Sequence, residues 1–232
     1  MVHPMARALC FLGGLTSIRG VRAAFVPRAE GVPVTVDKWE TLALLEPMHR
    51  QAVAAEGFGW GDLWRAEQVH GDRVAVVPEG AGRGDRILPG VDGLLTEKEG
   101  VLLGIYVADC AAVYLADRKT GALGLVHSGK RGTEREIVVR AVEGLGREFG
   151  TRPEDLEAAI SPCIRPPHYE VDFAADIERQ LAECGVPGGQ VARSGECTAA
   201  EVERYYSYRL EKGKTGRMLA LLGRSGQPGV KS

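Results

Sequence analysis

The sequence of 232 residues has no long hydrophobic run and no excess of charge of one sign. Its longest apolar run, residues 101–108, is interrupted by a glycine and is far shorter than the roughly 20 residues that cross a bilayer. Lysine and arginine total 29 against 31 acidic residues, so the net charge of −2 gives no general attraction to nucleic acid or to an anionic membrane. We therefore expect neither a membrane span nor a nucleic-acid partner.

The sequence also lacks the signs of a secreted protein. Its five cysteines are an odd number, spread from Cys10 to Cys197 without the spacing of a disulfide framework. The mildly apolar segment 6–15 has no clear small-x-small cleavage site after it, which argues against a secretory signal. The composition, 44% hydrophobic and 26% charged, is close to that of an average soluble globular protein. A cytoplasmic protein is the simplest prediction.

No linker and no internal repeat divides the chain, so we predict a single domain over residues 1–232. Residues 78–90 are rich in glycine, proline and charge and are typical of a long exposed loop. Two short segments, 70–72 and 117–121, are typical of hairpin turns, which favours antiparallel pairing. Apolar and β-branched runs predict strands over residues 33–36, 63–69, 73–77, 101–107, 112–116, 123–126 and 218–222.

Helical spacing dominates the second half of the chain. Apolar residues recur at four-residue steps over 137–149, behind Thr133 and Glu136 in capping-box spacing, and again over 173–181. Residues 199–211 are predicted to form a third helix. Together these elements predict an α/β (α+β) fold, a single-domain layered α/β sandwich with a mixed, largely antiparallel sheet.

Three side chains that bind transition metals stand where predicted strands end. They are His70, Cys110 and His127. Strand ends from distant segments can meet in one crevice, and the spacings of 40 and 17 residues match no closed zinc finger. Two imidazoles and one thiolate suit Zn²⁺ and leave its fourth position open, which is typical of catalytic zinc. On composition alone, a surface histidine in a turn and a cysteine packed as a small core residue are the preferred interpretation.

The surrounding motifs resemble, in order and spacing, those of the laccase-domain purine nucleoside phosphorylase family, whose members are also called polyphenol oxidase or peptidoglycan editing factor. The resemblance is strongest over 63–222, and residues 1–62 diverge. The motifs are Gln68-Val69-His70-Gly71, Val91-Asp92-Gly93, Ala108-Asp109-Cys110, the run from Val126 to Gly132, Ile160-Ser161-Pro162-Cys163, Tyr169-Glu170-Val171, Cys197-Thr198, Tyr206-Ser207-Tyr208-Arg209 and Thr215-Gly216-Arg217.

The resemblance implies that His70, Cys110 and His127 are the metal ligands and catalytic residues. It implies a zinc-dependent purine nucleoside phosphorylase with adenosine deaminase activity, whose small-molecule partners are a purine nucleoside and phosphate. Copper is a weaker candidate than zinc, because a single site resembles no multicopper array. Oligomeric state has no signature in the sequence.

Lys130 and Arg131 are the candidate phosphate-binding residues. They stand directly after His127-Ser128-Gly129 and before a predicted helix, so their charges and the backbone N–H groups could hold an anion beside the metal. A solvated corner of the surface is the ordinary alternative.

Three departures from the family pattern concern the substrate more than the metal. Lys130 stands where relatives usually carry tryptophan. The N-terminal Thr-Thr-Arg-x-Gly-Gly signature is represented only by residues 11–16, without an arginine before the glycines, and Arg19 or Arg22 are the candidate replacements. The insertion at 165–168 changes a loop that in relatives lies near the pocket.

Two other functions remain open at the sequence level. Cys110 could be a thiolate nucleophile with His127 as its base, in a hydrolase acting on peptidoglycan-type or amide substrates. Alternatively, the chain could bind metal but have lost catalysis, as the missing N-terminal arginine suggests. Metal dependence of activity separates these alternatives from a zinc enzyme.

Overall fold

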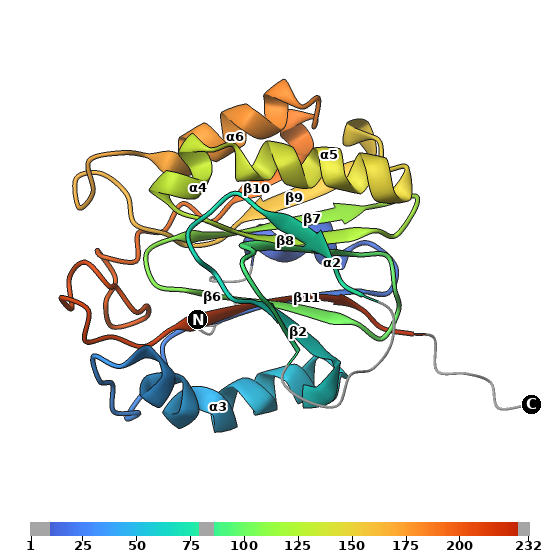
Figure 1. Cartoon of the computed structure of the whole chain (residues 1–232). Coiled ribbons are helices and arrows are strands. Elements are labelled where there is room, and N and C mark those ends of the chain that lie inside the picture. Colours follow the sequence, from blue (N-terminus) through green and yellow to red (C-terminus); the bar gives the residue numbers. More distant parts are fainter. Residues whose placement is uncertain (1–9, 79–85, 227–232) are drawn as a thin grey trace, which may run out of the picture.

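The computed structural model describes residues 10–78 and 86–226 of the chain. Two mixed β-sheets face each other, with helices on the outer side of each (Figure 1). The predicted layered α/β sandwich is therefore confirmed, and the boundaries of the domain at 1–232 stay a prediction. No helix in the described ranges is long and apolar enough to cross a bilayer.

The first sheet has the strand order β1-β11-β6-β2-β4. Its central strands β11 and β6 are antiparallel, whereas β2 runs parallel to both β6 and β4. Helix α3, Lys38–Ala55, covers its outer face (Figure 1). The strands are β1 Val21–Val26, β2 Leu63–Ala66, β4 Ile87–Leu88, β6 Leu102–Val107 and β11 Met218–Arg224.

The second sheet has the order β10-β9-β7-β8-β5-β3. Strand β7 lies at its centre and is buried along its whole length, as expected for a strand covered on both faces. Helices α4 Lys130–Glu134, α5 Ile137–Phe149 and α6 Phe173–Glu183 cover its outer face (Figure 1). The strands are β3 Val74–Val76, β5 Gly93–Thr96, β7 Ala111–Asp117, β8 Leu123–Ser128, β9 Leu156–Ile160 and β10 Val191–Arg193.

Short helical segments complete the chain. Helix α2, Gly13–Thr16, follows the 3₁₀ segment Cys10–Leu12. The other 3₁₀ segments are Trp60–Asp62, Pro153–Asp155 and Gly188–Gln190.

Three apolar clusters correspond to the three interfaces between layers. One fills the space between the two sheets, one lies under α5 and α6, and one lies under α3. Helix α5 shows how the sequence directs this packing, because its residues Ile137, Ala141 and Leu145 are fully buried at helical spacing. Helix α5 packs closely against the sheet, because a Cβ added to Gly144 would lie 2.8 Å from the Leu95 side chain of β5.

Most predicted elements are present, but the predicted turn at 70–72 is not a hairpin. Strands β2 and β3 belong to different sheets, so the segment around His70 crosses between layers instead of reversing a strand. The hairpin at 117–121 is confirmed, since β7 and β8 pair antiparallel and Asp117 accepts from the backbone of Lys119 and Thr120.

Two other local predictions were wrong, and a third was wrong in part. Residues 33–36 form no strand and lead into α3 instead. Residues 199–211 form turns rather than a helix, because the Glu211 side chain accepts from Ser207 N and Thr215 Oγ1 and pairs with Arg28 at 2.6 Å. Of the predicted loop 78–90, residues 79–85 lie outside the described residues and Ile87–Leu88 is strand β4.

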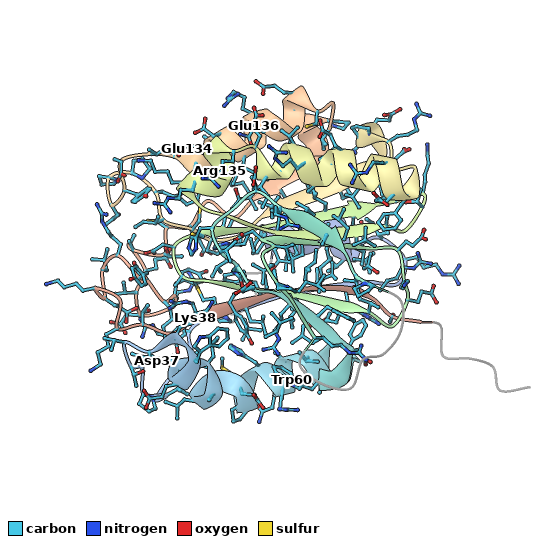
Figure 2. All side chains as sticks on the ribbon, in the orientation of Figure 1. Asp37, Lys38, Trp60, Glu134, Arg135 and Glu136 are labelled. Atoms are coloured by element: carbon cyan, nitrogen blue, oxygen red, sulfur yellow. The ribbon has the colours of Figure 1, made fainter. Side chains whose placement is uncertain are left out.

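The predicted capping box is also absent. Helix α5 begins at Ile137, directly after Glu136. The backbone of Glu136 is left-handed, with φ 59°, and its side chain accepts no capping hydrogen bond from the helix. Thr133 belongs to the separate helix α4, and its hydroxyl instead bonds the Ser128 hydroxyl at 2.9 Å. Glu134, Arg135 and Glu136 thus form the corner between α4 and α5 (Figure 2).

Candidate metal centre and active site

A pocket of about 890 Å³ opens where three strand ends meet. Strands β2 and β6 are parallel, so their carboxyl ends lie at the same edge of the first sheet. The chain passes directly from β6 into β7, whose first residue Ala111 pairs with Ser128 at the end of β8. The segments carrying His70, Cys110 and His127 therefore converge although they are far apart in the sequence.

The three predicted ligands do come together at this pocket. One ligand atom from each of His70, Cys110 and His127 lies within 4.8 Å of the other two. The two imidazole rings are 4.9 Å apart between centroids and nearly perpendicular, at 81°. The sulfur of Cys110 lies within 4.8 Å of a ring nitrogen of each histidine. All three line the pocket, with His127 buried and His70 exposed.

Asp92 is the residue that holds this group in place. Its fully buried carboxylate lies 2.8 Å from Nδ1 of His127, which leaves Nε2 of that ring for the centre. The same carboxylate accepts from the backbone N–H groups of Val69, His70 and Gly71 at 2.8 to 3.1 Å. A carboxylate bonded to the second nitrogen of a ligand histidine is a common support of zinc sites.

The backbone that carries His70 is bent to reach the centre. Gln68 and His70 both have positive φ, 64° and 59°, in the left-handed region. The Gln68 side chain compensates by forming two bonds to the backbone of Tyr106, accepting from its N–H at 2.9 Å and donating to its carbonyl at 2.5 Å. The bend is thus fixed by β6 on one side and by Asp92 on the other.

Cys110 follows a residue that is equally constrained. Asp109 has φ 80°, and its carboxylate accepts from Thr198 Oγ1 and from the backbone of Arg209, both at 2.7 Å. On the other side of the sulfur, a Cβ on Gly129 would lie 2.4 Å from Sγ. The position of Cys110 therefore requires glycine in the loop after β8.

The charges of the centre are coupled. Burial alone would raise the pKa of Cys110, but the charge of His127 and hydrogen bonds from both imidazoles lower it to about 6. Burial would lower the pKa of His127, but the Cys110 thiolate and the bond to Asp92 raise it to about 9. The residues therefore favour a thiolate beside an imidazolium, and a metal cation would replace the imidazolium proton.

The donor set fits a zinc ion. Zinc binds imidazole nitrogen at about 2.0 to 2.1 Å and thiolate at about 2.3 Å, so its ligand atoms must lie within a few ångströms of one another. The three atoms here meet that need, and the opening of the pocket leaves one side of the group free. The metal-binding and catalytic roles of His70, Cys110 and His127 stay predictions.

The two predicted phosphate-binding residues, Lys130 and Arg131, also line the pocket. They are the first residues of the five-residue helix α4 rather than a loop before a helix. Lys130 is partly engaged, because its Nζ lies 3.2 Å from Glu170. Arg19 and Arg22, the proposed replacements for the missing arginine, are exposed and do not line the pocket.

Sequence reasoning missed several residues of this site. Asp92 stands in a quoted motif, but nothing in its spacing indicated a bond to His127. No sequence pattern indicated Lys38, which begins α3 (Figure 2), and Arg217 was noted only as part of a motif. Tyr208, 55% exposed, contributes an aromatic face to the same pocket.

Comparison with known proteins gives a consistent assignment. The model of the family described as multi-copper polyphenol oxidoreductase laccase matches residues 45–178 and 170–225. A purine nucleoside phosphorylase of Deinococcus radiodurans is 38% identical over 207 residues, which cover 76% of this chain and 77% of that protein. The purine nucleoside phosphorylase YlmD of Geobacillus stearothermophilus is 34% identical, over 68% of this chain and 70% of its own.

Solved structures agree on the fold. The crystal structure of YlmD from Geobacillus stearothermophilus superposes with a TM-score of 0.77 at 28% identity, covering 90% of this chain and 93% of that one. The hypothetical protein YfiH of Bacillus licheniformis, at 24% identity, shares the fold with a TM-score of 0.79 over 88% of this chain and 93% of its own. This chain belongs to the laccase-domain family that those relatives represent.

Proposed function

We propose that the chain is a zinc-dependent purine nucleoside phosphorylase, with adenosine deamination as a second reaction at the same centre. The observation that carries the proposal is the convergence of two imidazoles and one thiolate on an open pocket of about 890 Å³. That volume is within the range of small-molecule sites. Relatives named purine nucleoside phosphorylase support the substrate class, a purine nucleoside together with phosphate.

Each residue has a distinct task in this proposal. Zinc held by His70, Cys110 and His127 supplies Lewis acidity and water activation near neutral pH. Asp92 keeps the His127 ring in one tautomer and orientation. Tyr208 offers an exposed face on which a purine can stack, and Lys130 and Arg131 hold the attacking phosphate. Positioning the phosphate against the sugar supplies much of the rate enhancement of such a reaction.

The test combines metal analysis with turnover. Purified chain is analysed for bound metal and assayed with adenosine and inosine, with and without phosphate. Stoichiometric zinc and phosphate-dependent release of base are the expected results, and His70→Ala and Cys110→Ala should lose both while keeping the circular dichroism of the parent. Full activity of a metal-free Cys110→Ala protein would refute the proposal.

A second candidate is a Cys–His hydrolase acting on amide or peptidoglycan-type substrates. It is favoured by the closeness of the Cys110 sulfur to both imidazoles and by the lowering of its pKa to about 6, which are features of an activated nucleophile. Such an enzyme should stay active in the presence of a metal chelator and should be inactivated by alkylation of the thiol. A zinc enzyme loses activity in chelator and recovers it when zinc is returned.

Cytoplasmic localisation belongs to the same proposal. All five cysteines are free thiols in the structure, and Cys110 must stay reduced to bind metal. Exposure to an oxidising compartment would compete with that role.

A further inference from the structure

Positive charge is concentrated in the pocket to a degree that the whole chain does not share. The chain has a net charge of −2, yet Asp109 is the sole carboxylate lining the pocket among the described residues. Both oxygens of Asp109 are already hydrogen-bonded. Against it stand six cationic side chains, Lys38, Lys130, Arg131, Arg209, Lys212 and Arg217. Such a concentration of positive charge attracts anions.

These cations enter the pocket from two layers of the fold. Lys130 and Arg131 belong to α4, on the outer side of the second sheet. Lys38 begins α3 (Figure 2), and Arg217 directly precedes β11, so both belong to the other layer. The His70, Cys110 and His127 group lies where the two sheets meet. The pocket is therefore lined by cations from elements of both layers.

The pair Lys38 and Arg217 differs from the other cations of the pocket in its ion pairing. Among the described residues, no ion pair engages Lys38 or Arg217, whereas Lys130 and Arg209 both approach Glu170. Within residues 10–78 and 86–226, the guanidinium of Arg217 donates through Nη1 to the carbonyl oxygens of Thr215 and Gly216 and lies 5.7 Å from the centroid of the Tyr208 ring. The Lys38 ammonium contacts the Trp39 ring at 5.0 Å. Lys38 and Arg217 line the same pocket; burial and next the charge of Arg217 lower the pKa of Lys38, whereas the charges of Asp92 and Glu67 raise it.

Two like charges in one partly buried place are destabilising unless an anion bridges them. A phosphomonoester is suited to the task, because its doubly charged oxygens accept hydrogen bonds from an ammonium and a guanidinium at once. Inorganic phosphate has a separate candidate seat at Lys130 and Arg131. Lys38 and Arg217 are therefore available to bind a phosphate group of the organic substrate itself.

We propose that the pocket binds a purine nucleoside monophosphate, with Lys38 and Arg217 holding the phosphate of the sugar. This inference rests on the proposed function and narrows its substrate class. The bond changes are those of phosphorolysis: an oxygen of inorganic phosphate bonds to the sugar C1′, the C1′–N9 bond breaks, and its electron pair leaves with the base, which takes up a proton. The products are a purine base and a sugar bisphosphate.

The experiment compares substrates on the zinc-loaded chain. Adenosine and inosine are assayed against their 5′-monophosphates at one concentration of inorganic phosphate. A charge-assisted phosphate contact is worth about 1.5 to 3 kcal/mol, so kcat/KM for the nucleotides should be at least about tenfold higher. Lys38→Gln should bring the nucleotide-to-nucleoside ratio close to one. Lys214→Gln, a nearby exposed lysine outside the pocket lining, is the matched control and should keep the parental ratio.

Two kinetic outcomes overturn the inference. One is a nucleotide-to-nucleoside ratio of kcat/KM of one or less in the parent protein. The other is a Lys38→Gln protein that keeps the ratio but has a raised KM for inorganic phosphate, because Lys38 would then hold the attacking phosphate.

A binding measurement separates this inference from the proposed reaction. Calorimetric titration of the zinc-loaded chain with 5′-AMP and with adenosine, without inorganic phosphate, needs no turnover. Nucleotide binding that depends on Lys38 supports the inference even where no base is released, and in that case the proposed phosphorylase reaction fails alone. Turnover of nucleosides without measurable binding of nucleotides leaves the reaction standing and overturns the inference.

Discussion

The carboxylate of Asp92 links three otherwise separate features of the site. It bonds the ring of His127, the backbone of His70 and the neighbouring turn, so one buried side chain orients two of the three candidate ligands. The fully buried charge is compensated by these bonds: burial raises the pKa of Asp92, but the bonds from His127, Gly71 and His70 outweigh it and lower the pKa. Asp92 is therefore a positioning residue for the centre.

Asp92→Asn should weaken zinc binding about 10- to 100-fold, the usual cost of losing such a supporting carboxylate. An amide in this place has only one accepting oxygen for the three N–H groups and the ring. Competition with a chromophoric chelator measures the affinity, and circular dichroism checks the fold. Asp72→Asn is the control, because Asp72 pairs with Arg140 at 3.1 Å and does not line the pocket. Equal zinc affinity in the parent, Asp92→Asn and Asp72→Asn proteins would contradict the positioning role of Asp92.

The charge state of Cys110 predicts an unusual pH dependence in the metal-free chain. A thiol is unreactive below its pKa, so alkylation of Cys110 should rise through about pH 6 and level off above it. For an unperturbed thiol, the rise would be centred near pH 8.5. Buried Cys163, whose pKa burial raises to about 12, should not contribute.

Mass spectrometry after timed exposure to iodoacetamide follows this reaction at Cys110. Cys110→Ala is the control for the remaining thiols, and added zinc should protect the parent. A midpoint near 9, or labelling unaffected by zinc, would show that the imidazoles do not act on this sulfur.

At the scale of elements, periodicity predicted those parts of the chain whose packing is simple. Helices α5 and α6 and strands β6, β7, β8 and β11 each present apolar residues to a layer interface, and their spacing was readable. Strand β1 was missed because the small residues Ala23 and Ala24 give little signal. Helix α3 was missed because Pro47 interrupts its interior and its apolar face is weak.

The predicted hairpin at 70–72 failed for a different reason. A short Gly-containing turn between two strand-like runs is the usual sign of a reversal, and only tertiary pairing decides that β2 and β3 join different sheets. The same limit applies to 199–211, where side-chain bonds of Glu211 replace helical bonds. In both places the departure from the local pattern lies beside the pocket, which is common at functional sites.

Helix α5 supplies a stability prediction at this scale. Leu145 is fully buried against the second sheet, so Leu145→Ala should lower the free energy of unfolding by about 2 to 5 kcal/mol. Arg147→Ala, on the exposed face of the same helix, should change it by no more than about 0.5 kcal/mol. Urea titration followed by circular dichroism measures both. Equal effects of the two substitutions would mean that α5 does not pack as described.

On the scale of the whole molecule, the site lies where segments from both sheets converge. His70 lies on the segment that crosses from β2 to β3, Cys110 on the connection from β6 to β7, and both connections join one sheet to the other. His127 belongs to the second sheet itself. A metal bound by the three side chains would therefore tie the two layers together, and its binding free energy would add to the stability of the folded chain.

Zinc should consequently raise the melting temperature of the whole chain. A ligand present at 100 times its Kd stabilises the folded state by about 2.7 kcal/mol, and 1 kcal/mol shifts Tm by about 2 to 4 °C for a domain of 150 to 250 residues. The expected shift is therefore about 5 to 11 °C, measured by calorimetry of metal-free chain with and without zinc. His70→Ala should remove most of the shift, because one of the two imidazoles is then lost. An equal shift in that variant would place the zinc outside the pocket, since binding there depends on all three ligands.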